Sequence, residues 1–154
     1  MSLHRLQTTL TLPITIDKAW EFFSDPANLA LITPPEMDFK ILTPLFKKET
    51  YAGQIIAYDV TPLPMMRTKW VTEITHVSKP SFFVDEQRVG PYQIWHHQHH
   101  FEEVNGQLLM TDIVHYQIPL GFIGDLMNHL FISRRIEKIF DYRTKKLTEL
   151  FVVK

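Results

Sequence analysis

Residues 92–118 read YQIWHHQHHFEEVNGQLLMTDIVHYQI, and this stretch predicts an antiparallel β-hairpin. Asn105-Gly106 stands between two runs of alternating side chains, and Asn-Gly is the strongest short-range signal for a two-residue hairpin turn. A two-residue turn makes Val104 face Gln107, and this register pairs the rest of the hairpin. The further pairs are Phe101 with Met110, His99 with Asp112, His97 with Val114, and Trp95 with Tyr116.

One face of this hairpin carries most of its apolar mass. Side chains alternate along a strand, so the eight residues of these four pairs share a face. We expect that face to point inward, because it holds Trp95, Phe101, Met110, Val114 and Tyr116. His97, His99 and Asp112 come inside with them, and burying such groups costs several kcal/mol unless they are paired or hydrated. His99 and Asp112 form a natural pair, since facing Cβ atoms lie about 5 Å apart.

The same alternation predicts inward-facing residues on two preceding strands. Phe83, Asp85 and Gln87 share one face of their strand, and Trp70, Thr72 and Ile74 share one face of theirs. An inner surface that mixes aromatic, imidazole, amide and carboxylate groups is typical of a pocket wall. We therefore expect a cavity for a small molecule with nine binding residues: Trp70, Asp85, Gln87, Trp95, His97, His99, Phe101, Asp112 and Tyr116.

The rest of the chain supplies more strands before this hairpin and a long helix after it. Leu3–Thr11 alternates as a strand, and short helices are expected from Asp17, as N-cap, to Ser24 and from Asp25 to about Leu31. Further strands are expected at 38–44, 53–60, 67–77 and 82–89. From Asp125 to about Val152 apolar residues recur at helical spacing, with Leu126 and Leu130 on the apolar stripe. This order predicts an α+β fold, a curved antiparallel sheet around a long C-terminal helix, in one domain spanning 1–154.

Composition narrows the class of protein. The chain has 154 residues, 45% hydrophobic and 21% charged, with a formal net charge of −1, so we expect no nucleic-acid partner. It has no cysteine, which excludes disulfides and thiolate chemistry. We find no signal peptide, no apolar run long enough for a membrane span, and no motif typical of serine hydrolases, NTPases, dehydrogenases or zinc proteases. We expect a cytoplasmic protein of undetermined oligomeric state.

Four segments of the second half resemble a known group. They are Trp70…Ile74, Phe83-x-Asp85-x-Gln87-x-x-Gly90-Pro91, Trp95-x-His97-x-His99-x-Phe101, and Asp112-x-Val114-x-Tyr116-x-x-Pro119-x-Gly121. This spacing is similar to a bacterial ligand-binding branch of the START-like superfamily, also called SRPBCC or Bet v 1-like, which includes polyketide cyclase/dehydrase-like members. The resemblance implies the helix-grip fold and a cavity between sheet and helix for a lipid, polyketide, steroid or other apolar molecule. It brings no agreed catalytic set with it.

The polar residues of the hairpin allow more than one interpretation. His97, His99 and Asp112 are a reasonable ligand set for zinc or iron. However, H-x-H on a strand is a weak motif without another strong ligand, so we expect no metal and no cofactor. His99 oriented by Asp112 can also act as an acid–base pair in a cyclase, dehydratase or isomerase, or simply hold two strands in register. We expect a binding protein, with this enzyme as the alternative. A protein–protein module would need an exposed apolar patch, and the sequence shows none.

Overall fold

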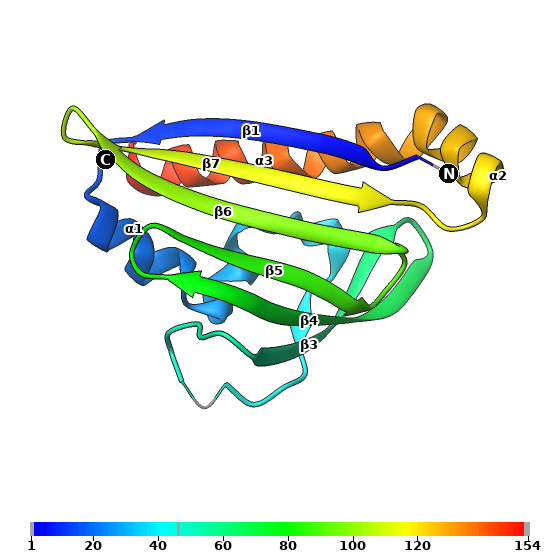
Figure 1. Ribbon diagram of the computed structural model, residues 1–154, viewed down its shortest axis with the longest axis horizontal. Coiled ribbons are helices and arrows are strands. Elements are labelled where there is room, and N and C mark those ends of the chain that lie inside the picture. Colours follow the sequence, from blue (N-terminus) through cyan, green and yellow to red (C-terminus); the bar gives the residue numbers. More distant parts are fainter. Residues whose placement is uncertain (1, 46, 153–154) are drawn as a thin grey trace.

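The computed structural model describes residues 2–45 and 47–152, and its frame is one antiparallel sheet backed by helices (Figure 1). The strand order is β1-β7-β6-β5-β4-β3-β2. The strands are β1 (His4–Leu12), β2 (Lys40–Ile41), β3 (Gln54–Leu63), β4 (Met66–Ser78), β5 (Phe82–Val89), β6 (Ile94–Val104) and β7 (Gln107–Gln117). The sheet is curved, and the α+β helix-grip architecture expected from the sequence is confirmed.

All helices lie on one side of this sheet (Figure 1). They are α1 (Ile16–Phe23), the 3₁₀ segments η1 (Pro26–Ile32) and η2 (Pro35–Met37), α2 (Gly121–Met127), the π-helical turn η3 (Asn128–Ile132) and α3 (Ser133–Phe151). In Figure 1, α3 runs behind β1 and β7. None of the helices in the described residues is long and apolar enough to cross a membrane.

The predicted hairpin register is confirmed at every pair. Asn105 and Gly106 both have positive φ, as the two-residue turn requires. His99 faces Asp112 and Trp95 faces Tyr116, as expected. The inward face is buried except for Trp95, which is partly buried, whereas the outward histidines of β6 are only partly buried. The alternation of the sequence therefore assigned the two faces correctly.

Two local predictions in the N-terminal half are wrong, one for the N-cap of α1 and one for the length of β2. The helix predicted from Asp17 is capped by Thr15, whose Oγ1 accepts a hydrogen bond from the N–H of Lys18. Asp17 lies in the first turn instead, where its charge favours the positive end of the helix dipole. The strand predicted over 38–44 shrinks to β2, because Asp38 before it adopts a left-handed φ of 43°.

The C-terminal helix starts earlier than predicted and is not uniform. Helical structure begins at Gly121, and η3 adds a wider turn before α3. Asn128 in this turn is buried, and its Oδ1 accepts a hydrogen bond of 3.1 Å from the hydroxyl of Tyr116. A π turn shifts the phase of the residues that precede it. Leu126 and Leu130, predicted on the buried stripe, are consequently exposed.

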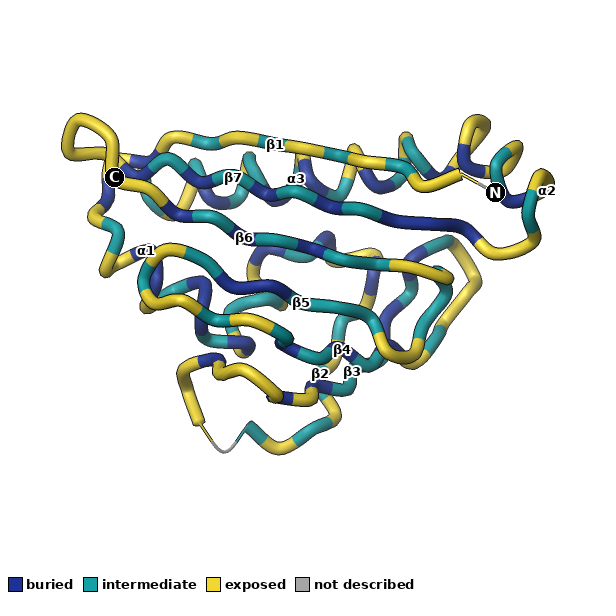
Figure 2. Tube along the Cα trace, in the orientation of Figure 1, coloured by how far each residue is buried: buried dark blue, intermediate teal, exposed yellow. Residues whose placement is uncertain are grey.

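An exposed apolar face covers α2 and η3, and the sequence patterns did not predict it. Phe122 and Phe131 are 80% and 66% exposed. The other exposed apolar side chains there are Leu120, Ile123, Leu126, Met127 and Leu130. Figure 2 shows this segment largely in yellow, at the end of the molecule beyond the sheet. Large exposed apolar faces are uncommon on isolated domains and usually mark a contact surface.

The core consists of three buried clusters, and each of them contributes residues to the cavity wall. Leu147 of α3 belongs to one buried cluster with Leu12 and Phe101, while Ile136 belongs to a second with Val114. In these two clusters α3 packs directly against β1, β7 and β6. The third cluster contains Val60 and Trp70 from β3 and β4 with Ile139 of α3, and it borders the open space described below.

Candidate ligand cavity and its polar cluster

A cavity of about 190 Å³ lies between α3, η1 and the strands β3 to β6. Ile56, Trp70 and Phe83 contribute to its sheet wall, and Ile136 and Phe140 contribute from α3. This volume is below the roughly 300–1,000 Å³ of most ligand pockets. The walls as they stand therefore admit only a compact molecule.

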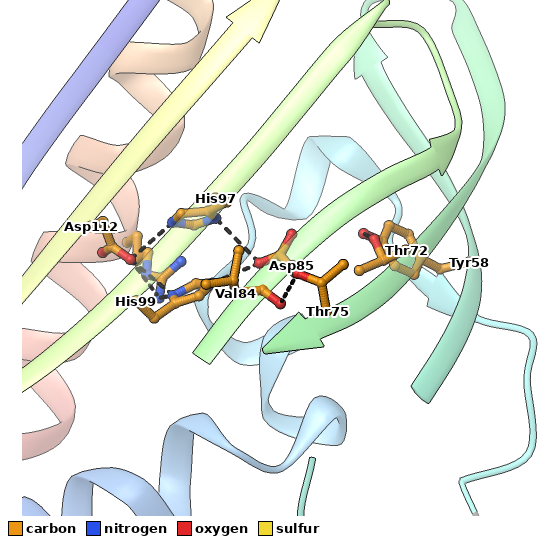
Figure 3. A network of polar contacts seen from close by, with 9 residues as sticks. Tyr58, Thr72, Thr75, Val84, Asp85, His97, His99 and Asp112 are labelled. Carbon is orange, nitrogen blue, oxygen red and sulfur yellow. Dashed lines mark hydrogen bonds and ion pairs between the residues drawn. The ribbon is translucent and has the colours of Figure 1, made fainter. Parts of the chain in front are cut away.

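Four aromatic side chains of the cavity wall pack against one another. The rings of Trp70 and Trp95 meet edge to face at 5.3 Å between centroids. Tyr58 stacks on Trp70 at 6.2 Å, and Tyr92 contacts Trp95 at 4.8 Å. The hydroxyl of Tyr58 is hydrogen bonded to Thr72 over 2.7 Å (Figure 3). The sequence pattern did not indicate Tyr58 or Tyr92 as binding residues, although Tyr58 is at a position of β3 whose side chain faces inward.

Beside these rings lies a polar cluster, which consists of Asp85, His97, His99, Asp112 and Arg143. Figure 3 shows the two carboxylates and the two imidazoles. His97 donates from Nε2 to Oδ1 of Asp112 over 2.9 Å. The Nδ1 of His99 lies 2.9 Å from the same oxygen. On its far side, His99 donates from Nε2 to Oδ2 of Asp85 over 2.7 Å. His99 is thus held by two carboxylates, and not by Asp112 alone as the sequence suggested.

The charges of this cluster balance one another. Burial opposes ionisation of Asp112, but the charge of Arg143 and the hydrogen bonds of both histidines hold the pKa of Asp112 well below its usual range. Burial likewise opposes a charged His99, yet its bonds to Asp112 and Asp85 raise its pKa. Burial and the neighbouring charge of His99 lower the pKa of His97. The two carboxylates therefore face the guanidinium of Arg143 and favour a protonated His99, whereas the surroundings of His97 favour its neutral form.

Arg143 is the one member of the cluster that was not among the residues considered from the sequence. It is only 7% exposed, and its guanidinium lies 5.7 Å from the ring centre of Phe23 and 5.9 Å from that of Phe140. Its Nη2 is 3.6 Å from Oδ1 of Asp112. The available signal was its spacing from Ile136, Phe140 and Leu147, which puts it on their face of α3.

Five of the nine predicted binding residues line the cavity: Trp70, Asp85, Trp95, His97 and His99. Phe101, Asp112, Tyr116 and Gln87 are not part of its lining. Phe101 and Tyr116 are buried in the first two clusters, at positions away from the cavity, and Asp112 lies behind the two imidazoles. Strand alternation predicts which side chains face α3, but over β7 the helix packs directly on them and leaves no cavity.

Gln87 holds the chain between β5 and β6 and does not border the cavity. Its Nε2 donates to the carbonyl of Tyr92 over 2.6 Å, and its Oε1 accepts from the N–H of Tyr92 over 3.2 Å. The side chain crosses Gly90 so closely that a Cβ there would lie 2.3 Å from Oε1. Gln87 and Gly90 therefore have a structural role: the glycine leaves room for the Gln87 side chain, whose two hydrogen bonds position Tyr92 beside Trp95.

Comparison with known proteins rests on structure, because neither a family model nor a curated protein matches the chain. Ginseng major latex-like protein 151 from Panax ginseng superposes with a TM-score of 0.70 over 97% of this chain and 98% of its own, at 11% identity. The chain has a Bet v 1-like fold. This fold is shared by protein CV1439 from Chromobacterium violaceum, with a TM-score of 0.72, 12% identity and 98% and 99% coverage. Protein Ms6760 from Mycobacterium smegmatis superposes with a TM-score of 0.64 at 16% identity, over 95% of this chain and 92% of its own.

The Bet v 1-like fold confirms the structural part of the resemblance found in the sequence. Identities of 11–16% establish the fold alone, since one fold hosts many functions.

Proposed function

We propose that this protein binds a compact apolar or amphipathic small molecule, of lipid, polyketide or steroid-like chemistry, in the cavity between the sheet and α3. The observation that carries the proposal is the mixed character of the cavity wall. Trp70 and Trp95 offer aromatic surface, and His97, His99 and Arg143 offer polar groups beside it. Such a wall suits a molecule with an apolar body and one polar end.

Arg143 indicates what that polar end is. A guanidinium has five N–H donors, and only its Nη2 has a polar contact among the described residues. Its Nε is buried without an acceptor. A buried donor that lacks a partner costs about 1–3 kcal/mol, so a ligand oxygen would relieve this cost. A carboxylate or carbonyl group is the chemistry that fits beside Arg143.

Two neighbouring residues of β3 provide the test. Ile56 is 6% exposed and lines the cavity, whereas Ile55 is 48% exposed on the opposite face. Ile56→Trp should fill the cavity and weaken binding of a fluorescent apolar anion, such as anilinonaphthalene sulfonate, at least tenfold. Ile55→Trp adds the same side chain outside and should leave binding unchanged.

Native mass spectrometry of protein purified from its source gives the second readout. We expect a co-purifying small molecule that Ile56→Trp no longer retains. Equal binding of the probe by both tryptophan variants, together with a protein that is always ligand-free, would reject the proposed function.

Acid–base catalysis on such a molecule, in a cyclase, dehydratase or isomerase, is the second candidate. The observation in its favour is that His97 and His99 both line the cavity. His99 already gives its Nε2 proton to Asp85, and the two carboxylates raise its pKa and so favour its protonated form, which has no lone pair to accept a proton. Neutral His97 donates through Nε2 and keeps a lone pair on Nδ1, so the role first considered for His99 suits His97 better. Turnover that persists in His97→Gln would exclude it.

A further inference from the structure

His97 and His99 turn opposite ring nitrogens toward Asp112. His97 contacts it through Nε2 and His99 through Nδ1. Their remaining nitrogens, Nδ1 of His97 and Nε2 of His99, both face Oδ2 of Asp85, at 3.6 and 2.7 Å. Asp112 thus contacts the two imidazoles on the side away from the cavity, and Asp85 contacts them on the side that lines the cavity.

We propose that Asp85, His97 and His99 bind a divalent transition-metal ion, such as Zn²⁺, at the wall of the cavity. The three ligand atoms lie within 4.8 Å of one another. Two imidazoles and one carboxylate form a set that suits zinc and its first-row neighbours. All three residues line the cavity, so the coordination positions that the protein does not fill would face a bound small molecule.

The place of Asp112 is the strongest support for this site. Histidines that bind metal almost always donate their other ring N–H to a carboxylate or carbonyl, which fixes the tautomer and the ring plane. Asp112 provides this contact to both imidazoles through one oxygen. The proposed set differs in one member from His97, His99 and Asp112, the set considered from the sequence. Asp112 orients the ligands, and Asp85 from β5 takes its place as the third ligand.

The charge of the cluster is compatible with an ion. The metal would replace the proton that His99 shares with Asp85, while Asp112 remains paired with Arg143, 3.6 Å away. Two carboxylates and one guanidinium leave one negative charge, so a divalent ion gives a site with one net positive charge. Such a site favours an anionic or carbonyl ligand, in agreement with the polar end assigned to Arg143.

The first experiment uses the wild-type protein and the metal alone. Calorimetric titration with Zn²⁺ should show one ion per chain, and Co²⁺ should give the visible absorption bands of an ion with nitrogen and oxygen ligands. The ¹⁵N resonances of the imidazoles provide the structural readout. Zn²⁺ should shift Nδ1 of His97 and Nε2 of His99, and leave the nitrogens that face Asp112 protonated.

Two variants and a matched control separate this site from the other histidines of the chain. Asp112→Asn should weaken Zn²⁺ binding about 10–100-fold, the usual effect of removing an orienting carboxylate. Asp85→Asn should weaken it more, since it removes a ligand. His96 and His115 lie on the outer face, with ring centres 6.3 Å apart, so the double variant His96→Ala/His115→Ala should bind Zn²⁺ with unchanged affinity.

Three results would overturn the metal site. They are the absence of Zn²⁺ and Co²⁺ binding to the wild type, the loss of binding in the outer-face double variant, and unchanged affinity in Asp85→Asn. The imidazole ¹⁵N spectrum of the wild type tests the site without any substitution, so the outcome does not depend on how well a variant folds. The metal is titrated without the organic probe, and the probe is titrated without the metal. The metal site can therefore fail while the proposed function stands, and the proposed function can fail while the metal site stands.

Discussion

His97 donates a hydrogen bond from its Nε2 to Oδ1 of Asp112 over 2.9 Å, and both side chains are only 7% exposed. The bond determines which nitrogen of His97 carries the proton and therefore leaves the Nδ1 lone pair on the side of Asp85. Asp112 can therefore influence the cavity although it does not line it. Asp112 acts through the imidazoles, which meet whatever occupies the cavity.

Asp112→Asn should destabilise the protein by about 3–5 kcal/mol. Its carboxylate compensates Arg143 and His99, and breaking a buried ion pair by removing one partner leaves an uncompensated buried charge. Urea denaturation measures the free energy of unfolding. Glu103→Gln, the same change at an exposed position of β6, should shift it by less than about 0.5 kcal/mol. Equal effects of the two variants would contradict the charge balance described above.

Gln87→Ala should lower the free energy of unfolding by roughly 1–3 kcal/mol, because it removes two hydrogen bonds to the backbone of Tyr92. Thermal unfolding measures this loss, and truncation of the exposed Val89 to Ala is the control. If Gln87 instead contacts the ligand, as the sequence suggested, Gln87→Ala will weaken probe binding without a change in stability.

Arg143→Met should weaken binding of a carboxylate ligand about 10–100-fold, since hydrogen bonds to charged groups contribute about 1.5–3 kcal/mol. The neutral ester of the same ligand should lose much less affinity, because its carbonyl accepts a hydrogen bond but carries no charge. Titrations with the matched acid and ester measure the difference, and Arg134→Met, which removes an exposed charge from the same helix, is the control. An equal loss for acid and ester would show that Arg143 supports the cavity and does not recognise charge.

Replacing Phe122 and Phe131 together by Glu should leave the free energy of unfolding within about 0.5 kcal/mol of the wild type, because both rings are largely exposed. Phe140→Ala, at a buried position of α3, should by contrast cost about 3–5 kcal/mol. Chemical denaturation at several protein concentrations measures both. A large loss in the double Glu variant would mean that the apolar face of α2 and η3 is covered in solution.

Tyr58 should make stability fall at alkaline pH. Burial, with the charge of Asp85, raises the pKa of Tyr58 far above its ordinary value near 10. Its stabilising effect is therefore complete below the pKa of the unfolded chain, and is lost as the pH rises above it, where only the unfolded state ionises. Tyr58→Phe should flatten this loss in denaturation curves between about pH 9 and 12. Tyr51→Phe, at an exposed ring, should not.

Much of the fold could be predicted because its signals are local. The Asn105-Gly106 turn and the alternation beside it determine the register of β6 and β7 and the face to which His97, His99 and Asp112 belong. Helix phase was harder. The π turn η3 moves Leu126 and Leu130 to the surface, and no periodicity read with a constant 3.6-residue turn includes such a shift.

The sequence by itself determined the strand faces and the inward histidines, since both follow from alternation and a two-residue turn. Only the tertiary structure decided what those histidines meet. Asp85 reaches His99 because β5 pairs with β6 in a register that places Asp85 opposite His97, and Arg143 arrives from a helix more than thirty residues away along the chain. The position of α3 also keeps the cavity over β3 to β6, since α3 packs directly on β7, whose residues do not line the cavity. These relationships depend on long-range packing, which no local pattern encodes.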